Sequence, residues 1–372
     1  MTFGSADGAP DRAKAARTAG LYYVNDGDAG LRRLSNGRGF RLQRSTGTPV
    51  TDHRVIERVK RLMIPPAWTD VWICASPRGH IQAVGRDARG RKQYLYHPDW
   101  RRIRDRGKFD RLLAFGRALP RIRARVDRDL ARRSLGKPRV LAAIIRLLDI
   151  AHVRVGNEEY ARANGSFGLT TFRDRHVRVT PTTLAFEFRA KSGKRQRIAL
   201  SDRRLARIVK ACQDLPGQQL FRYLDDDGTP RSITSSDVNA YLREIAGDDV
   251  SAKDFRTWAG TVLAGAALSA CGPCAGKAAA RRNLSAVVKQ VAARLGNTPT
   301  ICRKCYIHPA IMAAYEEGTV LLRLRPTPRA GATRRGRRLS AEEAALLRFL
   351  STLPSQLVRE SGATPRRLRR WR

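Results

Sequence analysis

Two patterns of hydrophobic and polar positions divide this chain. Up to about residue 100, short runs rich in β-branched and aromatic residues are separated by Gly, Asn and Asp, a pattern typical of strands and turns. The predicted strands cover 20–24, 39–43, 70–75, 80–85 and 92–97. One helix is predicted over 52–63, where Val55, Val59 and Leu62 share a face. This part predicts a small β-rich domain.

After Trp100 the apolar residues recur mainly at helical spacing. Helices are predicted over 139–153, 235–247, 278–296 and 340–350. Between residues 176 and 200 the period changes to two, which predicts three strands over 176–179, 184–190 and 195–200. The turn between the last two of these strands contains Ser192-Gly193 and places Lys191 at a hairpin tip.

Together these patterns predict an α+β protein with a small β-rich N-terminal domain and a larger, mainly helical domain that contains a three-stranded sheet. We expect four parts along the chain. They are a disordered leader over 1–19, the β-rich domain over 20–100, the larger domain over 101–325 and a basic tail over 326–372.

The charge of the chain indicates its partner. The 372 residues include 73 Lys and Arg against 33 Asp and Glu, a formal net charge of +40, while 42% hydrophobic residues suffice for ordinary cores. Folding gains nothing from such self-repulsion, so a polyanion is expected to neutralise it. Nucleic acid is favoured over an anionic membrane because the sequence contains no long apolar run and no basic helix with a bulky apolar face.

The first twenty residues contain no apolar stretch of the kind found in secretory signals. The six cysteines are therefore expected to be reduced thiols. We expect a cytoplasmic protein associated with the chromosome, that is, with the nucleoid.

Four separate segments carry the candidate chemistry. They are HVRVGNEEY around Arg154, FRAKSGK around Lys191, AKDFRTW around Lys253 and Arg256, and RLGNTPTICRKCY, which ends on Tyr306. A phenol can cut a phosphodiester and keep the energy of the bond as a phosphotyrosyl ester. Guanidinium groups match the charge that develops on the nonbridging oxygens, and the leaving sugar oxygen needs a positioned acid.

In this order the four segments resemble the catalytic domain of type IB DNA topoisomerases, particularly the small viral and bacterial ones. The resemblance covers roughly residues 20–325. It implies that Tyr306 is the nucleophile, which forms a covalent link to the DNA 3′-phosphate. It also implies that Arg154 and Arg256 hold the phosphate, that Lys191 is the general acid for the 5′-oxygen, and that Lys253 takes part in that proton relay.

One position departs from the family pattern. Asn297 in LGNTPT stands where the family usually has a histidine that bonds a nonbridging oxygen. An amide can donate that hydrogen bond but carries no charge, so we expect the phosphate contact to survive without any acid–base role. The segment GRKQYLYH resembles a DNA-contacting strand, which implies that Gln93, Tyr94 and Tyr96 reach the duplex.

The resemblance further implies a monomer that closes as a clamp around double-stranded DNA, nicks one strand, lets the free end turn and reseals it. No cofactor or metal is expected: the sequence has no G-x-x-x-x-G-K-[ST] string and its carboxylates are sparse and unclustered. Two alternatives stay open, a tyrosine recombinase with the same Arg, Lys, Arg, Tyr set and a nucleoid-binding protein without catalysis. The recombinase typically has H-x-x-R where this chain has Lys253-Asp-Phe-Arg256.

Two C-x-x-C pairs, Cys271/Cys274 and Cys302/Cys305, raise the alternatives of a zinc site or a redox pair. The first pair follows an apolar helix and fits its end, and the second adjoins the candidate nucleophile, so neither pattern is taken as a metal site. The Arg-rich tail is interpreted as an electrostatic DNA arm on which Trp371 could stack.

Overall fold

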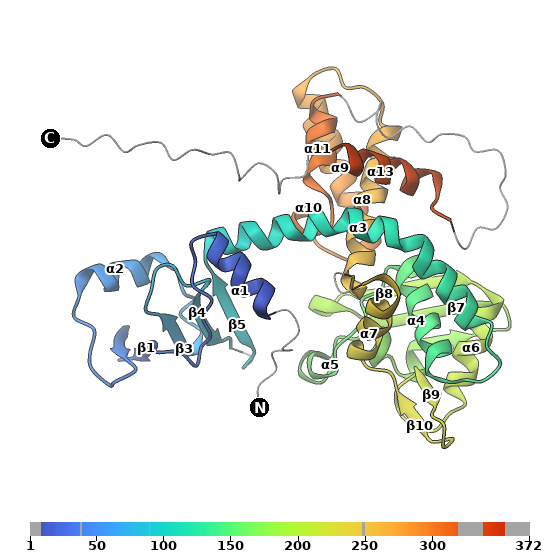
Figure 1. Ribbon diagram of the computed structural model, residues 1–372, viewed down its shortest axis with the longest axis horizontal. Coiled ribbons are helices and arrows are strands. Elements are labelled where there is room, and N and C mark those ends of the chain that lie inside the picture. The colour runs from blue at the N-terminus through green and yellow to red at the C-terminus, as the bar shows by residue number, and fades with distance from the viewer. Residues whose placement is uncertain (1–8, 38, 89, 248–249, 319–337, 354–372) are drawn as a thin grey trace. The chain divides into compact units, whose positions relative to one another are not determined.

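The computed structural model describes residues 9–37, 39–88, 90–247, 250–318 and 338–353. Its residue contacts divide the chain into two compact units, Met1–Lys108 (unit 1) and Phe109–Arg372 (unit 2). The boundary falls inside one long helix, α3 (Pro98–Leu130). The α+β prediction is confirmed, because unit 1 is built on a β-sheet and unit 2 is mainly helical (Figure 1). None of the helices in the described ranges is long and apolar enough to cross a membrane.

Unit 1 contains a five-stranded antiparallel sheet in the order β2-β1-β3-β4-β5. Its strands are β1 (Gly30–Ser35), β2 (Phe40–Arg44), β3 (Thr69–Cys74), β4 (Ile81–Arg86) and β5 (Lys92–Tyr96). Alternation along β3 sends Val71 and Ile73 into a cluster with α2 (His53–Arg61) and sends Trp72 to the opposite face. The sheet therefore has an apolar cluster on each face.

Two predictions for the N-terminal region are wrong, the strand over 20–24 and the disorder of the whole leader, and one strand, β1, was not predicted. The segment 20–24 is no strand: Tyr22 makes only an isolated bridge with Gly79. β1 was not predicted, because arginines interrupt its apolar pattern. One of them, Arg33, donates to the backbone carbonyls of Ile64 and Trp68. Within the segment expected to be a disordered leader, Ala9–Thr18 forms helix α1, while residues 1–8 lie outside the described residues.

Unit 2 is organised around the buried helix α4 (Lys137–Ala151), which packs against α6 (Arg203–Gln213), α7 (Ser235–Ala246) and α8 (Ala252–Ala270) (Figure 1). Its other helices include α5 (Glu158–Asn164), α9 (Lys277–Leu295), α10 (Pro299–Cys305) and α11 (Pro309–Glu316). The predicted helices over 139–153, 235–247 and 278–296 are confirmed as α4, α7 and α9.

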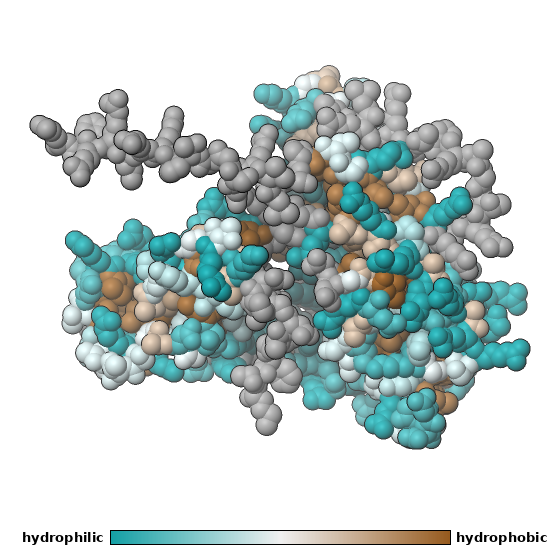
Figure 2. Space-filling view, viewed as in Figure 1, coloured by the Kyte–Doolittle hydropathy of each residue, from teal (hydrophilic) through white to brown (hydrophobic). Residues whose placement is uncertain are grey.

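The predicted three-stranded sheet is confirmed as β6 (Val177–Val179), β7 (Thr183–Arg189) and β8 (Arg195–Ser201). Alternate residues of β7 are buried in the core of unit 2, against α6. A short 3-10 turn, η3 (Lys191–Gly193), joins β7 to β8 and carries Lys191 at the tip, as predicted. A smaller hairpin, β9 (Arg222–Leu224) and β10 (Pro230–Ser232), is covered by hydrophilic side chains in Figure 2.

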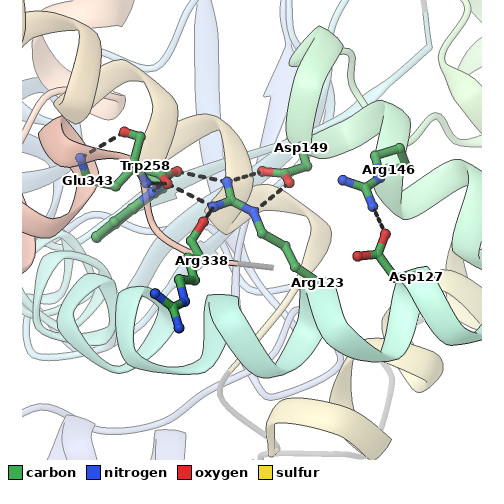
Figure 3. Close-up of polar contacts among 8 residues, drawn as sticks. Arg123, Asp127, Arg146, Asp149, Trp258, Arg338 and Glu343 are labelled. Atoms are coloured by element: carbon green, nitrogen blue, oxygen red, sulfur yellow. Dashed lines mark hydrogen bonds and ion pairs between the residues drawn. The ribbon is translucent and has the colours of Figure 1, made fainter. Parts of the chain in front are cut away.

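The helix predicted over 340–350 is confirmed as α13 (Ala341–Thr352), and it packs on α8. Figure 3 shows the polar contacts that hold it: Arg123 of α3 donates to Glu343 of α13 and to Asp149 of α4. The indole of Trp258 on α8 also donates to Glu343. This part of the basic tail therefore belongs to the core of unit 2, whereas Trp371 lies outside the described residues.

Candidate active site

The side chains predicted to act on the scissile phosphate come together in unit 2. Arg154, Lys191, Lys253, Arg256 and Tyr306 all line one pocket with a volume of about 290 Å³. Arg154 follows α4, Lys191 lies in the β7–β8 turn, and Tyr306 follows α10. Lys253 and Arg256 lie in the first turns of α8. None of the described residues that line this pocket is Asp or Glu. A surplus of positive charge around a concave surface suits a phosphate group.

Arg154 lies on a tightly folded connection after α4. The helix is capped by His152 in the left-handed conformation (φ 54°), and the Arg154 carbonyl accepts from the Leu169 amide at 3.0 Å. A Cβ on Gly168 would come within 2.6 Å of the Gly156 Cα, so the chain passes itself here only because both residues are glycine. This backbone therefore fixes the origin of the Arg154 side chain.

Arg256 is buried on α8, with 3% of its surface exposed. Its guanidinium donates to the carbonyls of His152 and Leu295, the latter at 2.6 Å, and its Nε has no partner within the described residues. Burial and the nearby charge of Arg154 lower the pKa of Arg256 to about 10, although Tyr306 acts in the opposite direction. Arg256 is thus a buried cation held by neutral carbonyls.

Tyr306 follows α10 and its backbone is fastened to α8. The Tyr306 carbonyl accepts from the Thr261 hydroxyl at 3.2 Å, and a Cβ on Gly260 would come within 2.6 Å of that same carbonyl oxygen. The Arg256 Cζ lies 5.1 Å from the centre of the Tyr306 ring. Burial raises the pKa of the phenol, but the charges of Arg256, Arg154 and Lys253 outweigh it, so the pKa of Tyr306 is lowered. The surrounding cations therefore make the Tyr306 phenol more acidic than a free tyrosine.

The two lysines lie at the exposed side of the pocket. Lys191 extends from the η3 turn, and its Nζ lies 5.9 Å from the centre of the Tyr160 ring. Lys253 is in the first turn of α8, three residues before Arg256, so the two side chains are one helical turn apart. Both amines are therefore accessible from solvent at the rim of the pocket.

Asn297 directly follows Gly296, the left-handed residue (φ 62°) that ends α9. It is 8% exposed, and its Oδ1 accepts from Arg154. Its Nδ2 is buried without a hydrogen-bond partner in the described structure. Asn297 is not among the described residues that line the pocket, so it lies behind Arg154, and its contact with a phosphate oxygen stays a prediction.

The predicted DNA-contacting residues of β5 do not all lie together. The rings of Tyr94 and Tyr96 are stacked, with centroids 5.9 Å apart, and Tyr94 is 41% exposed. Alternation along the strand sends Gln93 to the other face, where its amide donates to Asp87 at 2.9 Å. The structure therefore groups the two tyrosines and separates Gln93 from them.

Sequence reasoning missed the residues that position the site. Gly260 and Thr261 form the seat of the Tyr306 backbone, and Lys194 bonds the Asn297 carbonyl. Lys194 lies inside the FRAKSGK segment, and its nearness to Lys191 was the available signal. A glycine and a threonine inside an apolar helix give no comparable signal.

The cysteine pairs have different surroundings. Cys302 is buried in α10, whereas Cys271 is exposed after α8. The Cys274 thiol lies 2.9 Å from the Tyr315 hydroxyl, to which Asn283 donates. No group of three or more His, Cys, Asp or Glu that could hold a metal ion is present in the part of the chain that the structure describes.

Comparison with known proteins gives the family. The model of the family described as eukaryotic DNA topoisomerase I, catalytic core, matches residues 97–322, and that of the bacterial DNA topoisomerase IB N-terminal domain matches residues 39–87. DNA topoisomerase 1B of Acanthamoeba polyphaga mimivirus is 32% identical over 268 residues, 70% of this chain and 80% of the relative. DNA topoisomerase 1B of vaccinia virus is 23% identical over 291 residues, 73% of this chain and 86% of the relative.

The first match covers more than half of the chain, and the mimivirus relative is covered over most of its length. The chain therefore belongs to the type IB DNA topoisomerase family. This result confirms the resemblance that the four segments show. It also confirms the prediction that the chain is a DNA topoisomerase.

Proposed function

We propose that this protein relaxes supercoiled double-stranded DNA by transient cleavage of one strand through a 3′-phosphotyrosyl intermediate. The observation that supports it best is the pocket that the Tyr306 phenol shares with two guanidinium groups, with no Asp or Glu among its described lining residues. A bound phosphodiester would supply the missing negative charge, and its phosphorus would lie beside the Tyr306 oxygen. Unpaired guanidinium groups are suited to the extra charge of the transition state.

In the cleavage step, Tyr306 first loses its phenol proton to solvent, and the phenolate oxygen then attacks the phosphorus while the bond from phosphorus to the 5′-oxygen breaks. Arg154 and Arg256 bind the nonbridging oxygens, and the free Asn297 amide donates to one of them. Lys191 gives its proton to the departing 5′-oxygen. The product is a 3′-phosphotyrosyl ester and a free 5′-hydroxyl.

Resealing reverses these steps. The free strand turns about its partner under torsional strain, and its 5′-hydroxyl then attacks the phosphotyrosyl ester. Lys253 is placed to assist the proton relay, since it lies one helical turn from Arg256. The ester keeps the energy of the original bond, so no ATP is needed, and the fixed side-chain cations take the part that a metal ion plays in other phosphoryl-transfer sites.

Several finer points belong to the same proposal. The protein acts as a monomer that closes as a clamp on DNA at the nucleoid, and its charge of +40 supplies many phosphate contacts. Gln93, Tyr94 and Tyr96 of the β-rich domain contact the duplex. Lys253 in place of the recombinase histidine favours a topoisomerase over a tyrosine recombinase.

A supercoiled plasmid tests the proposal in buffer with EDTA and without ATP. We expect relaxation, and an SDS stop should trap a covalent protein–DNA adduct. Tyr306→Phe should bind DNA normally and form no adduct, whereas Tyr160→Phe, which removes the other phenol of the pocket, should still form one. An adduct with Tyr306→Phe refutes the assignment of the nucleophile. A dependence on paired sites would indicate a recombinase, and an unchanged linking number a passive DNA-binding protein.

A further inference from the structure

Lys194 connects two parts of the candidate active site. Its Nζ donates to the backbone carbonyl of Asn297 at 3.1 Å, across 103 positions of the chain. Its own carbonyl accepts from the Ala190 amide at 2.7 Å and closes the turn that carries Lys191. One residue thus holds the turn in shape and ties it to the connection between α9 and α10.

A second contact supports the same link. A Cβ on Gly296 would overlap the side-chain amide of Gln196, so β8 lies directly against the end of α9. Lys194 and Gln196 are two residues apart on the same side of the turn, and they contact the consecutive residues Asn297 and Gly296. The β7–β8 hairpin is therefore docked on this connection at two points.

The docked segments carry different chemical tasks in the proposed reaction. Asn297 accepts from Arg154, so it holds one of the two arginines that are proposed to bind the phosphate. Lys191 projects from the docked turn at the rim of the pocket. The distance between the phosphate and the acid consequently depends on how firmly the turn is held to Asn297.

We propose that Lys194 is a positioning residue that sets the reach of the Lys191 ammonium to the departing 5′-oxygen. This inference rests on the proposed function, in which Lys191 protonates that oxygen. Lys194 is not among the described residues that line the pocket, so it acts through the turn and not on the phosphate. Small misplacements of a catalytic group have large effects on rate, of about 100-fold for roughly 1 Å.

A change of leaving group tests this role. Single-turnover cleavage is measured on two synthetic duplexes that differ only at the scissile bond, one with the ordinary 5′-oxygen and one with sulfur in its place. A thiol has a pKa of about 8.5, so a thiolate departs without an acid. Loss of acid placement therefore slows cleavage of the oxygen duplex and spares the sulfur duplex.

We expect Lys194→Met to cleave the oxygen duplex about 10- to 100-fold more slowly than the wild type and the sulfur duplex at the wild-type rate. Lys191→Met should show the same pattern more strongly, and Lys194→Arg, which keeps a donor, should recover most of the loss. Arg195→Met is the matched control: it removes the next cation along the turn, which is exposed and lies 4.0 Å from Glu187. Its ratio of the two rates should equal that of the wild type.

Two results overturn the proposal. One is a wild-type rate for Lys194→Met on the oxygen duplex, and the other is an equal slowing on both duplexes, which would assign Lys194 to the phosphate. If Lys194→Met cleaves the sulfur duplex at the wild-type rate, that variant is folded. If Lys194→Met is insoluble, Lys194→Gln takes its place in the same experiment. Cleavage of both duplexes by the wild type, and of neither by Tyr306→Phe, supports the proposed function whatever Lys194 does.

Discussion

Arg123 and Arg256 are two arginines of unit 2, one largely and one fully buried, with opposite surroundings. Arg123 donates to the carboxylates of Asp149 and Glu343 at 2.8–2.9 Å, and these hydrogen bonds and charges outweigh its burial, so its pKa is raised (Figure 3). Arg256 donates to two backbone carbonyls and is also hydrogen-bonded to the Tyr306 phenol, and burial lowers its pKa to about 10. Carboxylates balance the positive charge of Arg123, whereas the positive charge of Arg256 is not balanced in this way.

The difference separates a structural charge from a charge available to a ligand. A buried ion pair leaves little net field outside itself, whereas an unpaired buried cation is unfavourable until an anion arrives. Arg154 and Lys253 line the same pocket as Arg256 and add positive charge to it, although both are more exposed to solvent. The pocket thus holds a buried cation without a carboxylate among its described lining residues, whereas the charge of Arg123 is paired with two carboxylates.

The largest effect is expected from Arg123→Met. It leaves Asp149 and Glu343 buried without their shared partner, so the free energy of unfolding should fall by about 3–5 kcal/mol in urea titrations. Cleavage by the folded fraction should stay close to normal, because Arg123 does not line the pocket described here. Arg121→Met, an exposed change on the same helix, should alter stability by less than about 0.5 kcal/mol. Equal stabilities of these two variants would contradict the structural role.

Arg256→Met should show the opposite division. Loss of one transition-state donor slows single-turnover cleavage by about 100- to 1000-fold, or roughly 2.7–4 kcal/mol in the barrier. Unfolding stability should be unchanged or higher, because an unneutralised buried charge is removed. Rapid-quench cleavage and urea unfolding of the same preparation check both parts. A large loss of stability in this variant would remove the contrast with Arg123.

The smallest effect concerns acid. Burial raises the pKa of Glu343, but hydrogen bonding and charge from Arg123 outweigh it, so its folded pKa lies below the unfolded value of about 4.3. Its stabilising contribution is therefore complete above that pH and is lost as the pH falls through the folded value. Glu343→Gln should be roughly 1.5–3 kcal/mol less stable than the wild type at pH 7, with a difference that shrinks in acid.

Glu342→Gln is the control for this prediction. Glu342 is the neighbouring, exposed carboxylate of α13, and it accepts from the Ser340 hydroxyl at 2.7 Å. Its unfolding curve should match that of the wild type from pH 3 to pH 7 within about 0.5 kcal/mol. A difference between Glu343→Gln and the wild type that stays constant over this range would show that the charge is not responsible.

Much of the fold follows from local patterns. The apolar stripes of α4, α7, α9 and α13 and the alternation in β7 and β8 are strong periodic signals, and the structure confirms them. The error at residues 20–24 has a physical reason: Tyr23 stacks on His80, with ring centroids 4.2 Å apart, so aromatic residues there serve packing and not pairing. β1 was missed because Arg33 uses its charge to bond backbone carbonyls.

The candidate site was partly predictable from the sequence as well. Tyr306, Arg154, Arg256, Lys191 and Lys253 are recognisable as a set in order along the chain, and the structure brings all of them to one pocket. Their supports depend on contacts between segments far apart in the sequence. No local pattern shows that Lys194 reaches the Asn297 carbonyl or that Gly260 makes room for Tyr306, because both facts arise only when α8, α9 and the hairpin are packed together.

The seat of Tyr306 on α8 bears on mechanical load. Thr261 holds the backbone of the tyrosine, and Arg256 projects from the same helix little more than one turn away. A DNA end joined to this tyrosine would transmit its force to the rigid helix α8 and not to a flexible loop. A force on the rotating strand would then displace Tyr306 and Arg256 together and keep the distance between them. The two ends of the cleaved strand would therefore return to the same alignment after each rotation.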